Sequence, residues 1–204
     1  MKDYDFLYAI GRLRALENGL INAAALEQLL AADFESALKT LYEKGWGSEG
    51  TPYEQMLERR LIQTWDLLKS INRYPGCLDQ LVIKNDFHNL KASLKAFVAH
   101  KGDAGDYFLR PSAYPPEQVR DRVFAREFEK LPEPLRIAAA RCYGELTAGG
   151  DAQMADVIAD SAAMRCMQDM AGKTGDAFLR DLAELAAATA NIKTAARAAL
   201  TRRT

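Results

Sequence analysis

The chain has 204 residues, of which 49% are apolar and 27% are charged, and its formal net charge is −1. This composition is typical of a folded, helix-rich protein rather than a disordered one. The near-neutral charge argues against a broad nucleic-acid-binding surface, because such a surface needs an excess of Lys and Arg. The length fits one large domain or two modest ones.

Cysteine usage and hydropathy indicate the cellular setting. Cys77, Cys142 and Cys166 are odd in number and lack CxxC spacing, so we expect neither a disulfide framework nor a zinc site. No apolar run in the sequence approaches the roughly 18 to 20 residues of a membrane-spanning helix, and no uninterrupted apolar segment follows Met1. We therefore expect a soluble cytoplasmic chain that can attach to a membrane complex as a peripheral component.

The first part of the chain predicts a cluster of short helices. Apolar residues recur at steps of three and four over residues 6–20, which is typical of an amphipathic helix, and Asp3 is a suitable cap for it. Asn22 and Asp33 are placed to cap two further short helices. The short connections between these elements predict a compact helical cluster.

A longer helix is predicted from Thr51 to about Ser70. Thr51 is the expected N-cap, Pro52 suits the first helical position, and Glu54 can reach back to the cap. A turn is expected at residues 74–76, where Tyr, Pro and Gly follow one another.

The next helix, from about Leu78 to Ala99, carries two neighbouring stripes. Its polar stripe consists of Asp86, Asn89 and Ser93. Its apolar stripe consists of Ile83, Phe87, Leu90, Leu94 and Phe97. Because buried polar groups must find partners, we expect the polar stripe to fix the arrangement of the neighbouring segments.

Residues 102–106 are rich in Gly and Asp and predict a boundary between two units. Helices are then expected over 117–130 and 135–146, followed by two more that begin at Asp151 and Asp176. The sequence lacks the sustained period-two alternation of β-branched residues that strands require. We therefore predict an all-α fold.

A sequence repeat supports two similar units. The offset between Asn89 and Asn191 is 191 − 89 = 102 residues. Several other pairs at this offset keep their chemical character: Glu58 with Asp160, Ile62 with Met164, Leu90 with Ile192, Lys91 with Lys193, and Lys95 with Arg197. We predict a long two-helix unit used twice, with a first repeat unit over 1–105 and a second over 106–204, and we expect the two helix pairs to superpose.

Two segments invite a catalytic or binding interpretation. Residues 172–174 read Gly-Lys-Thr, but Met167 stands where a phosphate-binding loop needs glycine, and no strand precedes them. His88 lies near Asp86, yet residues two apart on a helix point in different directions, and His100 is not at a metal-binding spacing. We expect no catalytic, metal or cofactor site, and a small helical enzyme centred on His88 and Asp86 is a minor hypothesis.

Methionines at helical spacing mark the helix that follows Asp151. They are Met154, Met164, Met167 and Met170. Such a stripe more often fills a core than binds a ligand, because methionine adapts to irregular gaps. The alternative is a free-standing helical adaptor that uses this face to bind an amphipathic partner helix.

Three segments carry a resemblance to a known family. Residues 8–17, 85–91 and 191–194 resemble, in order and approximate spacing, the C-type central-stalk subunit of the archaeal and bacterial V/A-type ATP synthases, which is related to the d-type subunit of the eukaryotic V-type ATPases. The run Asp-Phe-His-Asn-Leu-Lys at 86–91 is the most specific part of this resemblance. Family members resemble a chain of three helical units, and these 204 residues hold two, so we expect either a piece of a longer member or a shortened one.

The resemblance implies an all-helical, funnel-like protein of pseudo-repeated bundles. It also implies a non-catalytic component of the central stalk that couples the rotating shaft to the ion-translocating rotor ring in the membrane. The implied partners are therefore the shaft subunits and the rotor ring, with no cofactor, nucleotide or nucleic acid. The matching motifs look structural rather than interfacial, so the resemblance assigns no partner-contact residues.

Overall fold

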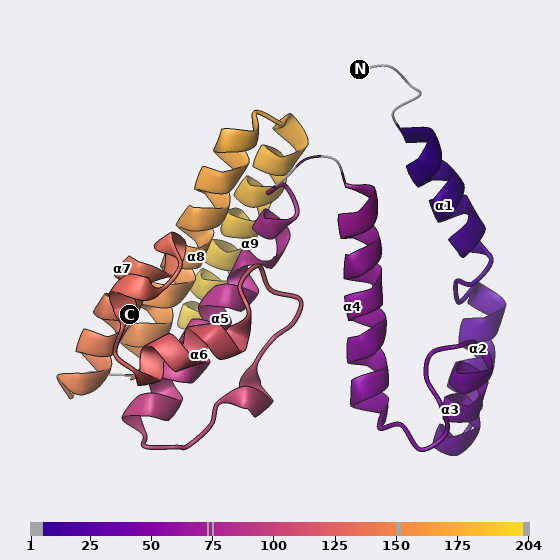
Figure 1. Ribbon diagram of the computed structural model, residues 1–204, viewed down its shortest axis with the longest axis horizontal. Helices are drawn as coiled ribbons and strands as arrows, with labels where there is room; N and C mark the ends of the chain where they lie inside the picture. Colours follow the sequence, from indigo (N-terminus) through magenta and orange to yellow (C-terminus); the bar gives the residue numbers. More distant parts are fainter. Residues whose placement is uncertain (1–5, 73, 75, 150–151, 202–204) are drawn as a thin grey trace. The chain divides into compact units, whose positions relative to one another are not determined.

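The computed structural model describes residues 6–72, 74, 76–149 and 152–201, and every regular element in these ranges is a helix (Figure 1). This confirms the all-α prediction. The α-helices are α1 (Leu7–Glu17), α2 (Ala23–Ala31), α3 (Phe34–Glu43), α4 (Tyr53–Ile71), α5 (Asp79–Val98), α6 (Pro116–Phe124), α7 (Glu133–Thr147), α8 (Ala152–Thr174) and α9 (Ala177–Thr201). Short 3-10 helices occupy Gly105–Tyr107 and Phe128–Lys130.

The chain folds as two compact units, residues 1–73 and 74–204. This division differs from the repeat units predicted over 1–105 and 106–204. It arises because α5 packs against α6, α7 and α8, so the first copy of the repeated motif lies inside the second compact unit. The superposition of the two helix pairs remains a prediction.

Three helices in the described part of the chain are capped by the side chains that the sequence predicted. Asn22 Oδ1 accepts a hydrogen bond from Ala25 N at 2.9 Å. Asp33 Oδ1 accepts one from Ser36 N at 2.8 Å. Asp176 Oδ1 accepts one from Leu179 N at 3.0 Å. These caps confirm three predicted helix starts, whereas the predicted caps Asp3 and Asp151 lie outside the described residues.

The predicted capping box at Thr51 is wrong. The N-cap of α4 is Pro52, which has a non-helical backbone and makes no side-chain cap bond. The hydroxyl of Thr51 instead lies 3.2 Å from that of Ser48. The helix therefore begins at Tyr53, because a local turn between Ser48 and Thr51 uses the hydroxyl that would otherwise cap the helix.

The first unit has a small core. Among residues 6–72 the buried apolar side chains are Ala25, Met56 and Trp65. Helix α1, whose residues are all described, has no buried side chain, although its apolar periodicity predicted an inward face. Large apolar side chains of this unit are exposed instead, including Leu7, Ile10, Leu13, Leu16 and Leu20. Exposed apolar residues in such number are typical of a surface that another protein surface covers.

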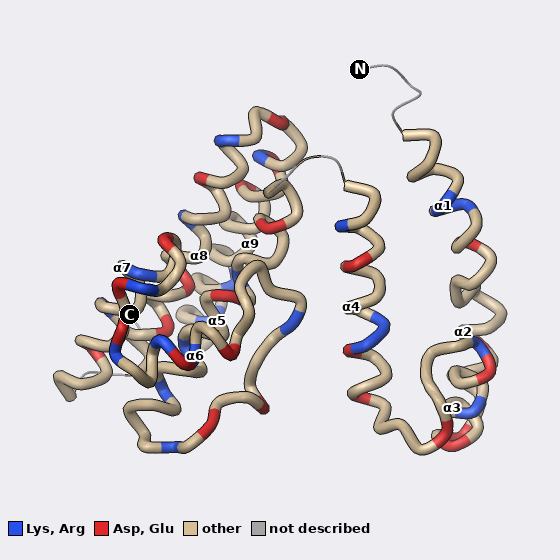
Figure 2. The backbone as a smooth tube through the Cα atoms, in the orientation of Figure 1, with Lys and Arg blue, Asp and Glu red and all other residues tan. Residues whose placement is uncertain are grey.

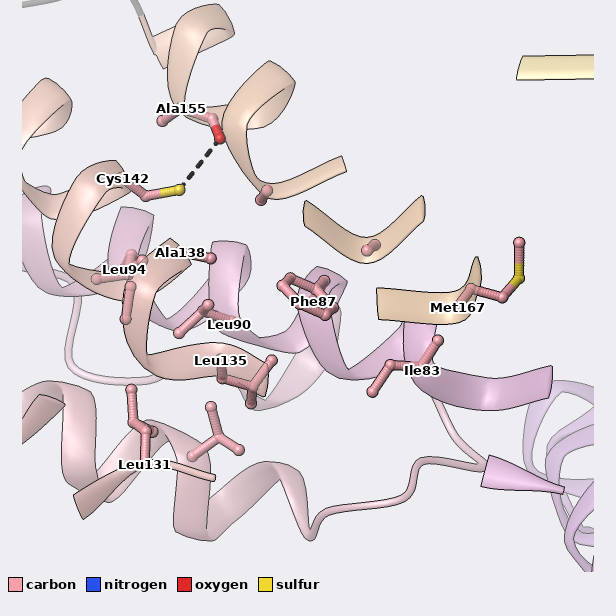
Figure 3. Close-up of a cluster of buried hydrophobic side chains, with 14 of the residues drawn as sticks. Ile83, Phe87, Leu90, Leu94, Leu131, Leu135, Ala138, Cys142, Ala155 and Met167 are labelled. Carbon is pink, nitrogen blue, oxygen red and sulfur yellow. Dashed lines mark hydrogen bonds between the residues drawn. The ribbon is translucent and has the colours of Figure 1, made fainter. Parts of the chain in front are cut away.

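The second unit has a continuous core centred on α5 (Figure 3). The predicted apolar stripe supplies Ile83, Phe87, Leu90 and Leu94, each at most 1% exposed. Facing residues come from α7, α8 and the segment before α7, among them Leu131, Leu135, Ala138, Ala155 and Ala159. The small side chains on α7 and α8 let the helices approach closely, and each large side chain buried here contributes roughly 1.5 to 3 kcal/mol.

The predicted helix over 117–130 is interrupted. Helix α6 ends at Phe124, and Arg126 has a positive φ of 57°. The chain then forms the 3-10 turn Phe128–Lys130 and buries Leu131 completely. A straight helix cannot turn its last residues toward the same core as Val123, so the break at Arg126 redirects Leu131 inward.

Helix α9 closes the second unit along α8. Gln80 of α5 is completely buried and its Nε2 donates to the carbonyl oxygen of Leu179 at 2.9 Å, which joins the two helices. Ala183 is the buried residue of α9, whereas Leu185, Ile192 and Leu200 are exposed. Acidic and basic residues are interspersed along both units (Figure 2).

Candidate functional site

Asp86 lies at the centre of a buried polar cluster on α5. Its side chain is completely buried, Oδ1 accepts a hydrogen bond from Tyr114 N at 2.9 Å, and Oδ2 accepts one from Ala113 N at 3.1 Å. Burial raises the pKa of this carboxyl from 3.8 to about 6, against the opposing effect of the two amide donors. The Asp86 side chain therefore binds backbone amides at the end of the connection between α5 and α6.

Asn89, one turn further along α5, holds the same connection by both ends of its amide. Its Oδ1 accepts from Leu109 N at 2.7 Å, and its Nδ2 donates to Leu109 O at 3.0 Å. Among uncharged side chains of this length only an amide supplies both an acceptor and a donor in this geometry. Ser93 completes the stripe, because its hydroxyl donates to Asn89 O at 2.8 Å.

Two partly buried side chains extend this arrangement. Asn85 Nδ2 donates to Pro111 O at 2.8 Å. His88 Nε2 lies 3.0 Å from Tyr107 O, and a carbonyl oxygen is only an acceptor, so Nε2 must carry the hydrogen. We call Asn85, Asp86, His88 and Asn89 the polar clamp, and residues 107–114, whose backbone they bind, the clamped loop.

Two lysines of the same motif bind the neighbouring helix α8. Lys91 Nζ lies 2.6 Å from Asp160 Oδ1, and Lys95 Nζ lies 2.7 Å from Asp156 Oδ1. These carboxylates are partly solvent-exposed, so each pair contributes at most about 1 kcal/mol. We therefore expect the completely buried Asp86 and Asn89 of the polar clamp to stabilise this region more than the ion pairs do.

The side chains of His88 and Asp86, on which the minor enzyme hypothesis depends, bind different partners. His88 binds Tyr107 and Asp86 binds Ala113 and Tyr114, so the two side chains do not converge on a common point. Among the described residues, no group of three or more His, Cys, Asp or Glu side chains is arranged to hold a metal ion. The polar stripe predicted to fix neighbouring segments does so through backbone groups.

The Gly-Lys-Thr segment at residues 172–174 and two of the cysteines also lie in structural positions. Residues 172–174 are the last residues of α8, and Gly175 with φ of 71° makes the turn to α9, as expected for a helix-helix connection. The buried Cys142 thiol lies 3.3 Å from Ala155 O, and burial raises its pKa to about 11, which makes it a poor nucleophile. Burial also raises the pKa of the Cys166 thiol.

The methionine stripe belongs mainly to the core. Met167 is 5% exposed, Met164 and Met170 pack against the core cluster, and Met154 is 48% exposed. The core interpretation is confirmed for three of the four residues. Of the methionine face that a helical adaptor would use to bind a partner helix, only Met154 is therefore exposed.

The sequence predicted that Asp86 and Asn89 fix neighbouring segments, but it predicted no such role for Asn85 or His88 and did not indicate the partners of any of the four. A backbone group leaves no signal in a side-chain pattern. The partners are the backbone groups of Tyr107, Leu109, Pro111, Ala113 and Tyr114. The second copy of the motif also behaves differently, because Asn191, at the position equivalent to Asn89, is exposed.

Comparisons with known proteins identify the family. No curated protein and no solved structure matched the chain. Among the described residues, no helix is both long and apolar enough to cross a membrane. The family described as ATP synthase (C/AC39) subunit matches residues 9–203, which span 203 − 9 + 1 = 195 of the 204 residues. The chain therefore belongs to the ATP synthase (C/AC39) subunit family.

Proposed function

We propose that this chain is a non-catalytic central-stalk subunit of a V/A-type rotary ATPase that couples the rotating shaft to the ion-translocating rotor ring. The observation that carries the proposal is the family match over residues 9–203. Membership in the family assigns a stalk subunit of a V/A-type ATPase, and the coupling role is our extension of it.

The use of the polar motif supports a mechanical role. The conspicuous polar side chains of residues 85–95 bind backbone groups and carboxylates of the same unit. A subunit that transmits torque must resist deformation, and a close-packed helical core with satisfied buried polar groups is stiff. The clamp and the α5 core together supply these properties in residues 74–204.

The proposed partners are the shaft subunits on one side and the rotor ring on the other. The chain would then be cytoplasmic and peripheral to the membrane through the complex, and it would bind neither nucleotide nor nucleic acid itself. The exposed apolar side chains of the first unit and of α9 agree with a protein that works within an assembly.

Reconstitution tests this proposal. An ATPase complex stripped of its own subunit of this family should regain ATP-driven ion pumping when the chain, in its full natural length, is added back. Co-purification with shaft subunits should accompany the recovery. ATP hydrolysis that remains uncoupled, with no chain retained on the complex, would contradict the proposal.

A further inference from the structure

A groove on the second unit lies beside the polar clamp, and His88 of the clamp and Tyr107, whose carbonyl oxygen His88 binds, both line it. It has a volume of about 430 Å³ and is bounded by α5, the segment that follows it, and Asp156 of α8. Three alanines line it, Ala92, Ala96 and Ala99, and we call them its alanine floor. These three alanines lie at steps of four and three, so they share one face of the helical turn.

The alanine floor determines what shape can enter. An alanine side chain ends at Cβ, so a partner helix can bring its own side chains close to the α5 backbone. Tyr107 stands at the rim and is 62% exposed. Tyrosine at the edge of an apolar depression is a residue type that protein interfaces favour, because its ring offers area and its hydroxyl can bind.

The charges around the groove determine which partner fits. Its lining contains three lysines, Lys91, Lys95 and Lys101, and one carboxylate, Asp156. Lys101 has no acidic partner within the described part of the chain. Because Lys91 and Lys95 are paired with Asp160 and Asp156, Lys101 supplies the unpaired positive charge of the lining, and a complementary occupant carries an acidic side chain near it.

The ion pairs favour a protein segment over a small anion. The ammonium groups of Lys91 and Lys95 are directed to Asp160 and Asp156 at 2.6 and 2.7 Å, so a free phosphate would have to compete with two carboxylates. Both lysines line the groove, and the methylene stems of lysine side chains offer apolar surface to an occupant. Apolar lysine stems, an alanine floor and one unpaired lysine suit an amphipathic helix better than an inorganic ion.

We infer that the groove formed by α5, Lys101, Tyr107 and Asp156 docks an acidic amphipathic helix of another subunit of the same complex. This inference rests on the proposed function, because the occupant is a neighbouring stalk or rotor subunit. It adds to that function a contact surface on the second unit and the chemistry of its partner.

Site-directed photo-crosslinking in the reconstituted complex tests the inference. A photoreactive amino acid replaces Tyr107, and the matched control replaces Ile137, which is 74% exposed on α7. We expect a crosslink from position 107 to an acidic helical peptide of another subunit, and no such peptide from position 137.

Four results would overturn the inference. As long as the chain is retained on the complex, none of them contradicts the proposed function. These are the absence of a crosslink at position 107, a crosslink to a basic segment, a crosslink to a second copy of the chain, and a crosslink to residues 6–72 of the same chain. Failure of the unlabelled chain to join the complex would instead contradict the proposed function itself.

Charge reversal provides an independent measurement. Lys101→Glu should weaken binding of the chain to the stripped complex by about tenfold at low salt, because like charges then face each other across the interface. The difference should shrink as salt is added. Lys173→Glu makes the same change at an exposed position on the last turn of α8 and should leave binding nearly unchanged. Equal effects of the two variants would overturn the inference.

Discussion

Replacing Asn89 with alanine removes the two hydrogen bonds that join α5 to Leu109. Each bond contributes roughly 0.5 to 1.5 kcal/mol net, and a backbone group left unpaired away from water costs about 1 to 3 kcal/mol more. Water can reach part of the exposed connection, so we expect Asn89→Ala to lower the free energy of unfolding by about 2 to 4 kcal/mol. Asn191→Ala is the matched control, because Asn191 is exposed and should change stability by less than about 0.5 kcal/mol.

Urea unfolding measures this effect with two probes. Both tryptophans of the chain, Trp46 and Trp65, lie in the first unit, so their fluorescence follows that unit, whereas far-ultraviolet circular dichroism follows helices in both. We expect Asn89→Ala to shift a transition seen by circular dichroism to lower urea without an equal shift in fluorescence. A variant as stable as the Asn191→Ala control would refute the assignment of the clamp as a buried, stabilising cluster.

Burial of particular side chains leads to three further predictions. Because the folded pKa of Asp86 is raised from 3.8 to about 6, its contribution to stability is fully present below pH 4 and is lost as pH rises through 6. The loss is on the order of 3 kcal/mol, and Asp86→Asn should remove this pH dependence in urea unfolding. Cys142, with a pKa of about 11, should react with a thiol reagent at pH 8 only after the chain unfolds, as peptide mapping would show. Leu94→Ala should cost about 2 to 5 kcal/mol, whereas Leu200→Ala, at an 84% exposed position, should cost less than about 0.5 kcal/mol in the same denaturation assay.

The sequence predicted those parts of the fold that side-chain periodicity determines. The apolar stripe of α5 is buried as expected because its spacing matches one helical face. The caps at Asn22 and Asp33 formed because each side chain needs only an amide two or three residues ahead. Such features depend on neighbours in the chain, and a single sequence contains that information.

Features that depend on distant segments were not predictable in the same way. The interruption at Arg126 is set by the burial of Leu131 against α5 and α7, which local helix propensity does not report. The repeat offset also gave no indication that α5 would pack with α6, α7 and α8 in one compact unit. Tertiary packing determined both outcomes and overrode the local pattern.

The comparison of Asn89 with Asn191 clarifies what the motif does. An asparagine on a helix face has the same donor and acceptor in both copies, but only Asn89 meets a returning loop and is buried. The polar stripe is therefore a means of binding backbone, and its effect depends on which segment lies opposite. In this unit the Asp, His, Asn and Lys side chains of the motif bind backbone groups and carboxylates of neighbouring segments.

His88 connects the clamp to the groove. Its Nε2 binds Tyr107 O, and its side chain lines the same groove as Lys101 and Tyr107. A helix docked against Tyr107 would therefore press on a residue whose backbone is already held to α5, so force applied at the groove passes directly into the core helix. Under the proposed coupling role, a docking surface must be joined firmly to a packed helix, and the hydrogen bond from His88 to Tyr107 O is one such connection.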